Sequence, residues 1–226
     1  MLVDVISSIA EARSDLFLNR TAIVVDVLRA TSTIITALEN GSSGVLAVET
    51  VCQAKTSRQP GDLLGGERFC KKIAGFELGN SPLEYTEEVV GGKRVVLTTT
   101  NGTRAIQKSA KAAHLLAGAL LNSASCAEAA LRFRRDIIIL CSGTQDEFAL
   151  EDGLCAGLLV EELANRCTEP IVVNDFAAAM LHAYRSARPA LQEIIMQSSN
   201  GRKLAKIGFE EDVRYCCEVN RTSVVP

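Results

Sequence analysis

Two polar turns are the places where this sequence is best equipped to bind an anion. The stretch from Asp26 to Thr33 reads DVLRATST, and the stretch from Thr98 to Arg104 reads TTTNGTR. Each follows an apolar run and leads into a helix-like segment, where backbone N–H groups, hydroxyls and a guanidinium fork can hold a phosphate. The alternative is that each turn only caps a helix. The run of four polar residues at 98–101 is longer than capping requires, so it favours a binding function. The candidate binding residues are Arg29, Thr31, Ser32, Thr99, Asn101, Gly102 and Thr103.

Carboxylates lie in or near such turns. Asp26 opens the first turn, Glu67 lies in a Gly-Gly-Glu-Arg segment, and Glu151 and Asp152 begin a helix-like segment. Carboxylates accompanied by hydroxyls, without clustered histidine, suit a hard cation such as Mg²⁺ better than zinc. The sequence therefore favours phosphoryl chemistry, in which a metal neutralises the phosphate and guanidinium groups stabilise its charge. For residues 151 and 152 the alternative is that they only complement a helix dipole.

Glycine-containing segments predict loops in which the backbone approaches a ligand closely. They are Gly65 to Arg68 and Gly75 to Pro82, and Cys141 to Gly143 forms another turn at a strand end. Familiar phosphate-site motifs are missing. There is no GxxxxGK segment, and Leu28 stands where an Asp-x-Asp pair beginning at Asp26 would need its second carboxylate.

The elements that must position these residues alternate along the chain. Runs rich in β-branched residues predict strands at 21–27, 45–49, 93–99, 114–120, 136–141 and 170–173. Amphipathic or Ala- and Leu-rich segments predict helices at 31–40, 102–113, 123–133 and 151–166, and a helical region at 174–208 broken near Pro189 and Asn200-Gly201.

This alternation predicts an α/β fold. Wholly apolar runs at 137–141 and 171–173 indicate strands buried on both faces, which requires a three-layer α/β/α arrangement with a largely parallel or mixed sheet. A weak internal similarity between IVVDVLRATSTI and VVLTTTNGTRAI leaves two similar lobes as an option. Ligands of such sheets bind at the carboxyl ends of the strands, where the polar turns fall.

Length and charge narrow the classes of function. The 226 residues fit one domain, 1–226, and 24 Lys and Arg against 27 Asp and Glu give a net charge of −3. This balance argues against a nucleic-acid or membrane partner and favours a small molecule. No apolar run is long enough to span a membrane, and Asp4 and Glu11 argue against a signal peptide. We expect a cytoplasmic protein whose eight cysteines are reduced.

Several long segments together resemble the 2-phosphosulfolactate phosphatase family. They occur in order from Thr21 to Pro226, nearly the whole chain, and read VVDVLRATSTI, GGER, GFELGNSPLEY, TTTNGTRA, CSGTQDEFALEDGLCAG and DVRYCCEVNRTSVVP. The resemblance implies a magnesium-dependent phosphomonoesterase that converts 2-phospho-3-sulfolactate to 3-sulfolactate and phosphate in coenzyme M biosynthesis. It also implies that further motif positions belong to the site, namely Arg68, Asn80, Ser81, Gly143 and Arg214.

The roles expected for these residues follow from a substrate that bears phosphate, sulfonate and carboxylate. Asp26 and Glu67 would hold the metal, and Asp152 would be a third ligand or the base that activates water, with Glu151 also a candidate ligand. Arg29, Arg68 and the turn at 98–103 would hold phosphate. Arg214 or the Asn80-Ser81 pair would meet the sulfonate or carboxylate. Asp26 as a nucleophile that forms an aspartyl-phosphate is an alternative that the sequence leaves open.

Two other functions stay open at this point. One is the same chemistry on another small phosphorylated acid, because family membership constrains chemistry more than substrate. The other is a non-catalytic module that binds anions. The expected partner is a small anionic phosphorylated substrate, and a homodimer is an open option for assembly.

Overall fold

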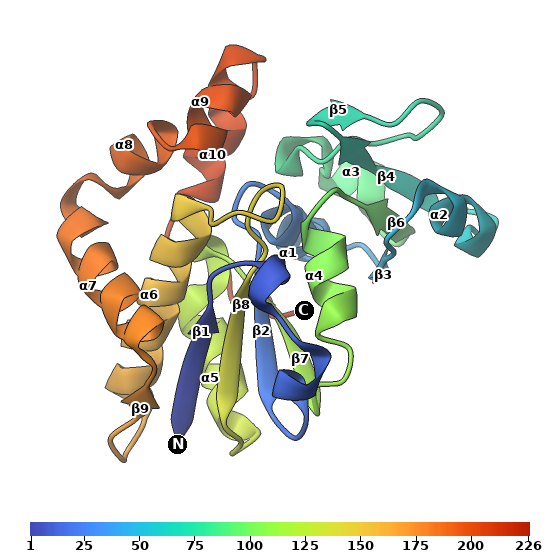
Figure 1. The fold of residues 1–226 in the computed structure, drawn as a ribbon. Helices are drawn as coiled ribbons and strands as arrows, with labels where there is room; N and C mark the ends of the chain where they lie inside the picture. Colours follow the sequence, from blue (N-terminus) through green and yellow to red (C-terminus); the bar gives the residue numbers. More distant parts are fainter.

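The computed structural model describes all residues from 1 to 226 and contains two β-sheets (Figure 1). The strands are β1 (Leu2–Ile6), β2 (Thr21–Val25), β3 (Gly44–Ala47), β4 (Leu63–Arg68), β5 (Lys71–Lys72), β6 (Arg94–Thr98), β7 (His114–Gly118), β8 (Ile137–Cys141) and β9 (Val172–Val173). The helices are α1 (Ala30–Glu39), α2 (Val51–Ser57), α3 (Glu87–Val90), α4 (Gly102–Lys108), α5 (Ser123–Arg132), α6 (Leu150–Arg166), α7 (Asp175–Ala187), α8 (Leu191–Met196), α9 (Ser199–Lys206) and α10 (Glu210–Cys216).

The larger sheet has five parallel strands in the order β7-β2-β8-β1-β9. Strand β8 shows why it needs helices on both sides. Ile137 and Ile139 belong to the core cluster that includes α5, α6 and α7, whereas Ile138 and Leu140 pack into a second cluster with Phe17 and α4. Alternate side chains of this strand are thus buried on opposite faces. The predicted three-layer α/β fold is confirmed.

The smaller sheet has the order β3-β6-β4-β5, with β5 antiparallel to its neighbour. Val95 and Leu97 of β6 pack toward α1, and Val96 packs toward α2 on the other face. Helix α1 also contacts β7 of the larger sheet, and its Ile35 packs there with Ala119 and Leu121. Helix α1 therefore packs against both sheets, which places the turn before it where the two sheets meet.

Some sequence predictions require correction. The apolar run at 171–173 is not a strand buried on both faces, because Val172 of the two-residue edge strand β9 is 60% exposed. Strand β1 was not predicted. The break predicted near Asn200-Gly201 falls at Gln197 and Ser198, and the Ser198 side chain caps α9 by accepting from the Gly201 N–H.

The segment Gly65 to Arg68, expected to be a loop, lies in strand β4. A Cβ at Gly65 would lie 2.2 Å from the Tyr85 hydroxyl, and one at Gly66, whose φ is +146°, would lie 2.0 Å from the Thr98 carbonyl oxygen. These glycines permit close packing within the protein rather than approach to a ligand. This packing fixes the position of the next residue, Glu67.

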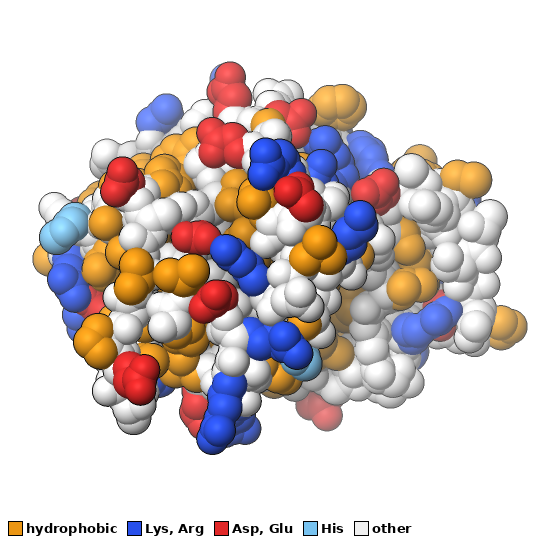
Figure 2. All heavy atoms as spheres, turned by 60° about the horizontal axis from the view of Figure 1, so that its bottom comes forward, with side chains coloured by type: hydrophobic (Ala, Val, Ile, Leu, Met, Phe, Trp, Pro, Cys, Tyr) orange, Lys and Arg blue, Asp and Glu red, His pale blue; other side chains and the backbone are white.

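The carboxyl ends of the parallel strands point to the top of Figure 1, where α9 and α10 lie opposite β4 and β5. The opposite end of the molecule carries charges of both signs on its surface. Figure 2 shows acidic and basic side chains interspersed over that face. No helix is both long and apolar enough to cross a membrane.

Candidate active site

A pocket of about 60 Å³ opens at the carboxyl ends of β2, β4 and β6. A cavity of this size accommodates a few waters or one compact anionic group. A larger groove of about 700 Å³, beside α6 and α7, contains none of the predicted site residues. The small pocket is lined by polar residues from both sheets and from α9, namely Asp26, Arg29, Glu67, Asn80, Thr99, Thr100, Asn101, Thr144, Gln145, Asn200 and Lys203.

Asp26 follows β2 directly and is 8% exposed. Its Oδ1 accepts a hydrogen bond from the Ala30 N–H at 3.0 Å, which fixes the carboxylate at the start of α1. Burial, reinforced by the Glu67 and Glu151 carboxylates, raises the pKa of Asp26 to about 7. A carboxyl group with this pKa can exchange a proton near neutral pH or become ionised when a cation arrives.

The turn after β6 packs closely on Asp26. A Cβ at Gly102 would lie 2.5 Å from Asp26 Oδ2, so this close approach requires glycine. Thr99 and Thr103 fix the turn internally, since the Thr103 N–H donates to Thr99 Oγ1 and the Thr99 N–H donates to Thr103 Oγ1, each at 3.1 Å. Of the residues predicted here, Thr99 and Asn101 line the pocket, whereas Gly102 and Thr103 support it from behind.

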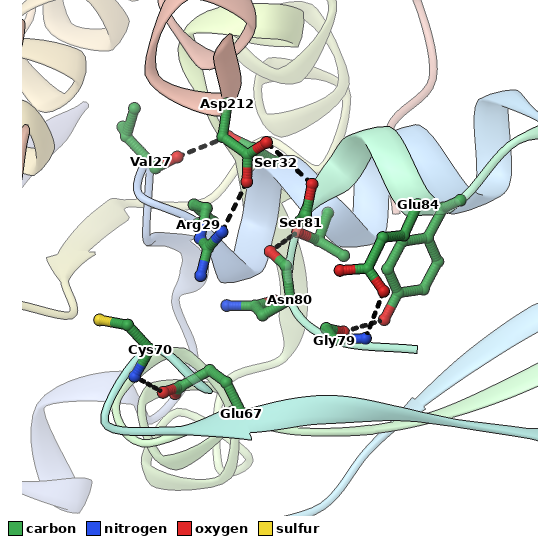
Figure 3. Close-up of polar contacts among 12 residues, drawn as sticks. Val27, Arg29, Ser32, Glu67, Cys70, Gly79, Asn80, Ser81, Glu84 and Asp212 are labelled. Carbon is green, nitrogen blue, oxygen red and sulfur yellow. Dashed lines mark hydrogen bonds and ion pairs between the residues drawn. The ribbon is translucent and has the colours of Figure 1, made fainter. Parts of the chain in front are cut away.

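Glu67 connects two turns. Its Oε1 accepts from the Thr100 N–H and its Oε2 accepts from the Cys70 N–H, both at 2.7 Å. Figure 3 shows the contact of Glu67 with Cys70. Cys70 and Phe69 form the two-residue turn between β4 and β5, at φ angles of +64° and +55°. Each Glu67 oxygen keeps a lone pair for a further ligand while the backbone holds the carboxylate in place.

Residues of the C-terminal helical region hold the Arg29 side chain in place. Its Nη1 lies 2.5 Å from Asp212 Oδ2 of α10, and the two side chains are 3% and 4% exposed. The Arg29 guanidinium also lies 4.4 Å from the centre of the Phe209 ring, and Ser81 Oγ donates to Asp212 Oδ1 at 2.8 Å. Figure 3 shows the free side of the guanidinium directed into the space between Asn80 and the Glu67–Cys70 turn.

Buried oxygens without partners line the same pocket. Asn80 Oδ1, Thr100 Oγ1 and Asn101 Oδ1 accept no hydrogen bond from the protein. A buried polar atom normally has a partner, so three such atoms around one pocket indicate that a ligand completes the site.

Asp152 and Glu151 lie behind the pocket rather than in it. Asp152 Oδ1 accepts from the Val27 N–H at 2.8 Å, and its Oδ2 accepts from the Gly143 N–H at 3.0 Å. Burial and the charges of Asp26 and Glu151 raise the pKa of Asp152 well above its ordinary value. Glu151 Oε1 accepts from the Asn200 side chain at 2.7 Å. Asp152 and Gly143 therefore position the strand-end loops, and neither lines the pocket.

The predicted set of four metal-binding carboxylates does not form one cluster. No three Asp, Glu, His or Cys side chains form a group that could hold a metal ion. Asp26 and Glu67 line the pocket, whereas Glu151 and Asp152 do not. Glu151 and Asp152 direct their oxygens at amide and backbone donors, so metal binding by these two residues stays a prediction from the sequence.

Other predicted residues also make internal contacts. Thr31 Oγ1 donates to the Asp26 carbonyl, and Ser32 Oγ donates to the Val27 carbonyl, so both hydroxyls serve the start of α1. The Arg68 guanidinium donates to the carbonyls of Glu67 and Glu49 and to Thr98 Oγ1, and Arg68 does not line the pocket.

Arg214 does not reach the pocket. Its side chain is 48% exposed on α10 and pairs with Glu210 and Glu211. Asp212, two residues earlier, is the member of this helix that contacts Arg29 and Ser81, and sequence reasoning missed it. The pocket-lining residues Asn200 and Lys203 were also missed, because no local pattern in the sequence marks the face of α9 that they share.

Fold and site together define an α/β protein with a small, oxygen-rich pocket at the strand ends. A family model described as 2-phosphosulpholactate phosphatase matches residues 7–226, and the chain belongs to this family. Two proteins named "Probable 2-phosphosulfolactate phosphatase" illustrate the similarity. That of Thermotoga petrophila is 43% identical over 92% of this chain and 88% of its own. That of Clostridium novyi is 38% identical over 100% of this chain and 96% of its own.

Proposed function

We propose that the protein hydrolyses the phosphate ester of 2-phospho-3-sulfolactate. One observation carries this proposal: in a chain of this family, a single small pocket contains Asp26, Glu67, Arg29 and buried oxygens without partners. The names of the relatives supply the substrate. The use of the product in coenzyme M biosynthesis remains a prediction from the resemblance.

The pocket residues fit a bound Mg²⁺. Carboxylate and amide oxygens are ligands of this ion, and Asp26, Glu67, Asn80 and Asn101 supply them. Mg²⁺ in proteins commonly uses one or two carboxylates and completes its shell with water and substrate phosphate. Bound there, it would neutralise phosphate charge and polarise the phosphorus. The pair Asp26 and Glu67 therefore replaces the four-carboxylate set in our proposal.

In the reaction, a water oxygen forms a bond to phosphorus and the ester P–O bond breaks. The leaving C2 oxygen takes up a proton, and 3-sulfolactate and inorganic phosphate result. Arg29, held by Asp212, directs its remaining N–H groups at the phosphate oxygens and stabilises their charge.

Besides binding Mg²⁺, Asp26 has two candidate roles in the reaction, as the base that takes a proton from water or as a nucleophile that is phosphorylated for part of the cycle. Rapid acid quench with substrate labelled at phosphorus separates them, because only the second role leaves label on the protein. Asp26→Asn should abolish turnover in either case. Full magnesium-dependent turnover by this variant would reject both roles.

Phosphate release from 2-phospho-3-sulfolactate, with Mg²⁺ and with EDTA, tests the proposed function. We expect release that requires Mg²⁺ and a kcat/KM well above those for generic phosphomonoesters. Equal rates on a panel of small phosphorylated acids would favour another substrate of the same chemistry. Tight binding of phosphate without release from any ester would favour a non-catalytic anion-binding module.

A further inference from the structure

We propose that Lys203 determines specificity by binding an acidic group of the substrate other than the phosphate. This inference rests on the proposed function and deepens it. Asp26 and Glu67 face a cation and Arg29 faces the phosphate, so the second acid of a phosphorylated acid needs a further positive group.

Lys203 is the pocket cation without an acidic partner. Arg29, the other cation that lines the pocket, has its charge balanced by Asp212 at 2.5 Å. Lys203 takes part in none of the ion pairs of the protein. Its ammonium group is therefore available to a ligand, and a compact charge with three donors suits a carboxylate or sulfonate.

The helix that carries Lys203 is fixed against the site. Asn200 lies one turn earlier on the same face of α9 and also lines the pocket. Its amide nitrogen donates to Thr144 Oγ1 at 2.5 Å and to Glu151 Oε1 at 2.7 Å. Leu204, which is 2% exposed, anchors the adjacent side of the helix in the core. These contacts hold the helix in place while Lys203 lines the pocket.

The position of α9 supplies the geometry that the predicted residue Arg214 lacks. Figure 1 shows α9 across the strand ends from β4 and β5, which carry Glu67 and the Phe69–Cys70 turn. A substrate whose phosphate lies between Asp26, Glu67 and Arg29 would extend its remaining groups toward α9. The second acid then meets Lys203.

The test compares Lys203→Met with wild type on three esters. 2-Phospho-3-sulfolactate carries two further acids, 2-phospholactate carries only the carboxylate, and glycerol 2-phosphate carries neither. The variant should lose about 10-fold to 100-fold in kcat/KM on phosphosulfolactate, mainly through KM, and nothing on glycerol 2-phosphate. A matching loss on 2-phospholactate assigns Lys203 to the carboxylate, and retention there assigns it to the sulfonate. Loss on all three esters, or on none, overturns the proposal.

Lys206→Met is the matched control, because Lys206 lies on the same helix, is exposed and does not line the pocket. It should behave as wild type on every ester. Calorimetric binding of 3-sulfolactate gives a readout independent of turnover. Lys203→Met should weaken binding of 3-sulfolactate by the same factor and leave binding of inorganic phosphate unchanged. Equal affinities of wild type and variant for 3-sulfolactate would reject the role of Lys203. The proposed function itself fails separately, if the wild-type protein releases no phosphate from any ester.

Discussion

The Arg29 guanidinium and the Asp212 carboxylate lie 2.5 Å apart in the protein interior, although 183 residues separate them in sequence. Arg29 belongs to the first polar turn, and Asp212 belongs to one of the last helices. The pair joins the C-terminal helices to the strand-end turns and orients the cation that faces the pocket.

Asp212→Ala should destabilise the protein by about 3–5 kcal/mol, because it leaves the Arg29 charge buried without its partner. Urea unfolding measures the loss. The control is Glu210→Ala, which removes the half-exposed partner of Arg214 and should change stability by less than about 0.5 kcal/mol. Similar effects from both variants would contradict the importance assigned to the buried pair.

The raised pKa of Asp26 predicts a pH dependence of stability in metal-free protein. Between its ordinary 3.8 and about 7, the folded protein keeps a proton that the unfolded chain has released. The contribution of Asp26 to the free energy of unfolding therefore falls as pH rises through that interval. Above pH 7 the folded protein carries the full cost of ionising this buried carboxyl group. Asp26→Asn removes the penalty, so its advantage over wild type should grow from near zero at pH 4 to about 1–3 kcal/mol at pH 8. Urea unfolding in EDTA across this range measures it, and a constant difference would contradict the assignment.

Mg²⁺ should stabilise the wild-type protein by mass action, by about 2.7 kcal/mol at a concentration one hundred times its dissociation constant. Glu67→Gln should lose most of this gain, because the amide replaces one anionic oxygen by a donor. Glu87→Gln, an exposed change on α3, should keep it. Thermal unfolding with and without the ion gives the comparison. Retention of the full gain by Glu67→Gln would remove Glu67 from the proposed ligands.

The turn between β4 and β5 offers a stability test. Cys70 has a φ of +64°, where a side chain is strained and glycine is not. Cys70→Gly should therefore stabilise the protein by about 0.5–1 kcal/mol, and its N–H still donates to Glu67. Cys52→Gly, at an exposed position in α2, should instead destabilise it. The proposed strain is wrong if both changes lower the denaturation midpoint.

The sequence predicted the strands whose β-branched residues form uninterrupted runs, such as β2, β6 and β8. The sequence analysis missed β4 because Gly65 and Gly66 are typical of loops. Only the structure shows that Tyr85 and Thr98 pack so closely on this strand that glycine is required there. The turns that hold Asp26, Arg29 and Asn101 could be predicted because a local pattern of residue types carries the signal. Lys203 and Asn200 could not be predicted as pocket residues, because no local pattern indicates which face of α9 lies toward the pocket.

Arg214 and Asp212 show the same limit within one helix. An arginine near the start of a family motif is a reasonable candidate for binding an anion. However, residues two apart on an α-helix project in nearly opposite directions, so only one of the pair can face the interior. The interior position belongs to Asp212, whose role depends on a partner far away in sequence.

Asp26 ends a strand of the larger sheet, whereas Glu67 belongs to the smaller one. An ion held by both would therefore crosslink the two sheets, which otherwise meet through α1, α4 and the turn after β6. Amide hydrogen exchange should then slow in both sheets at once when the ion binds, including at amides far from any ligand atom, and this protection should disappear with Glu67→Gln.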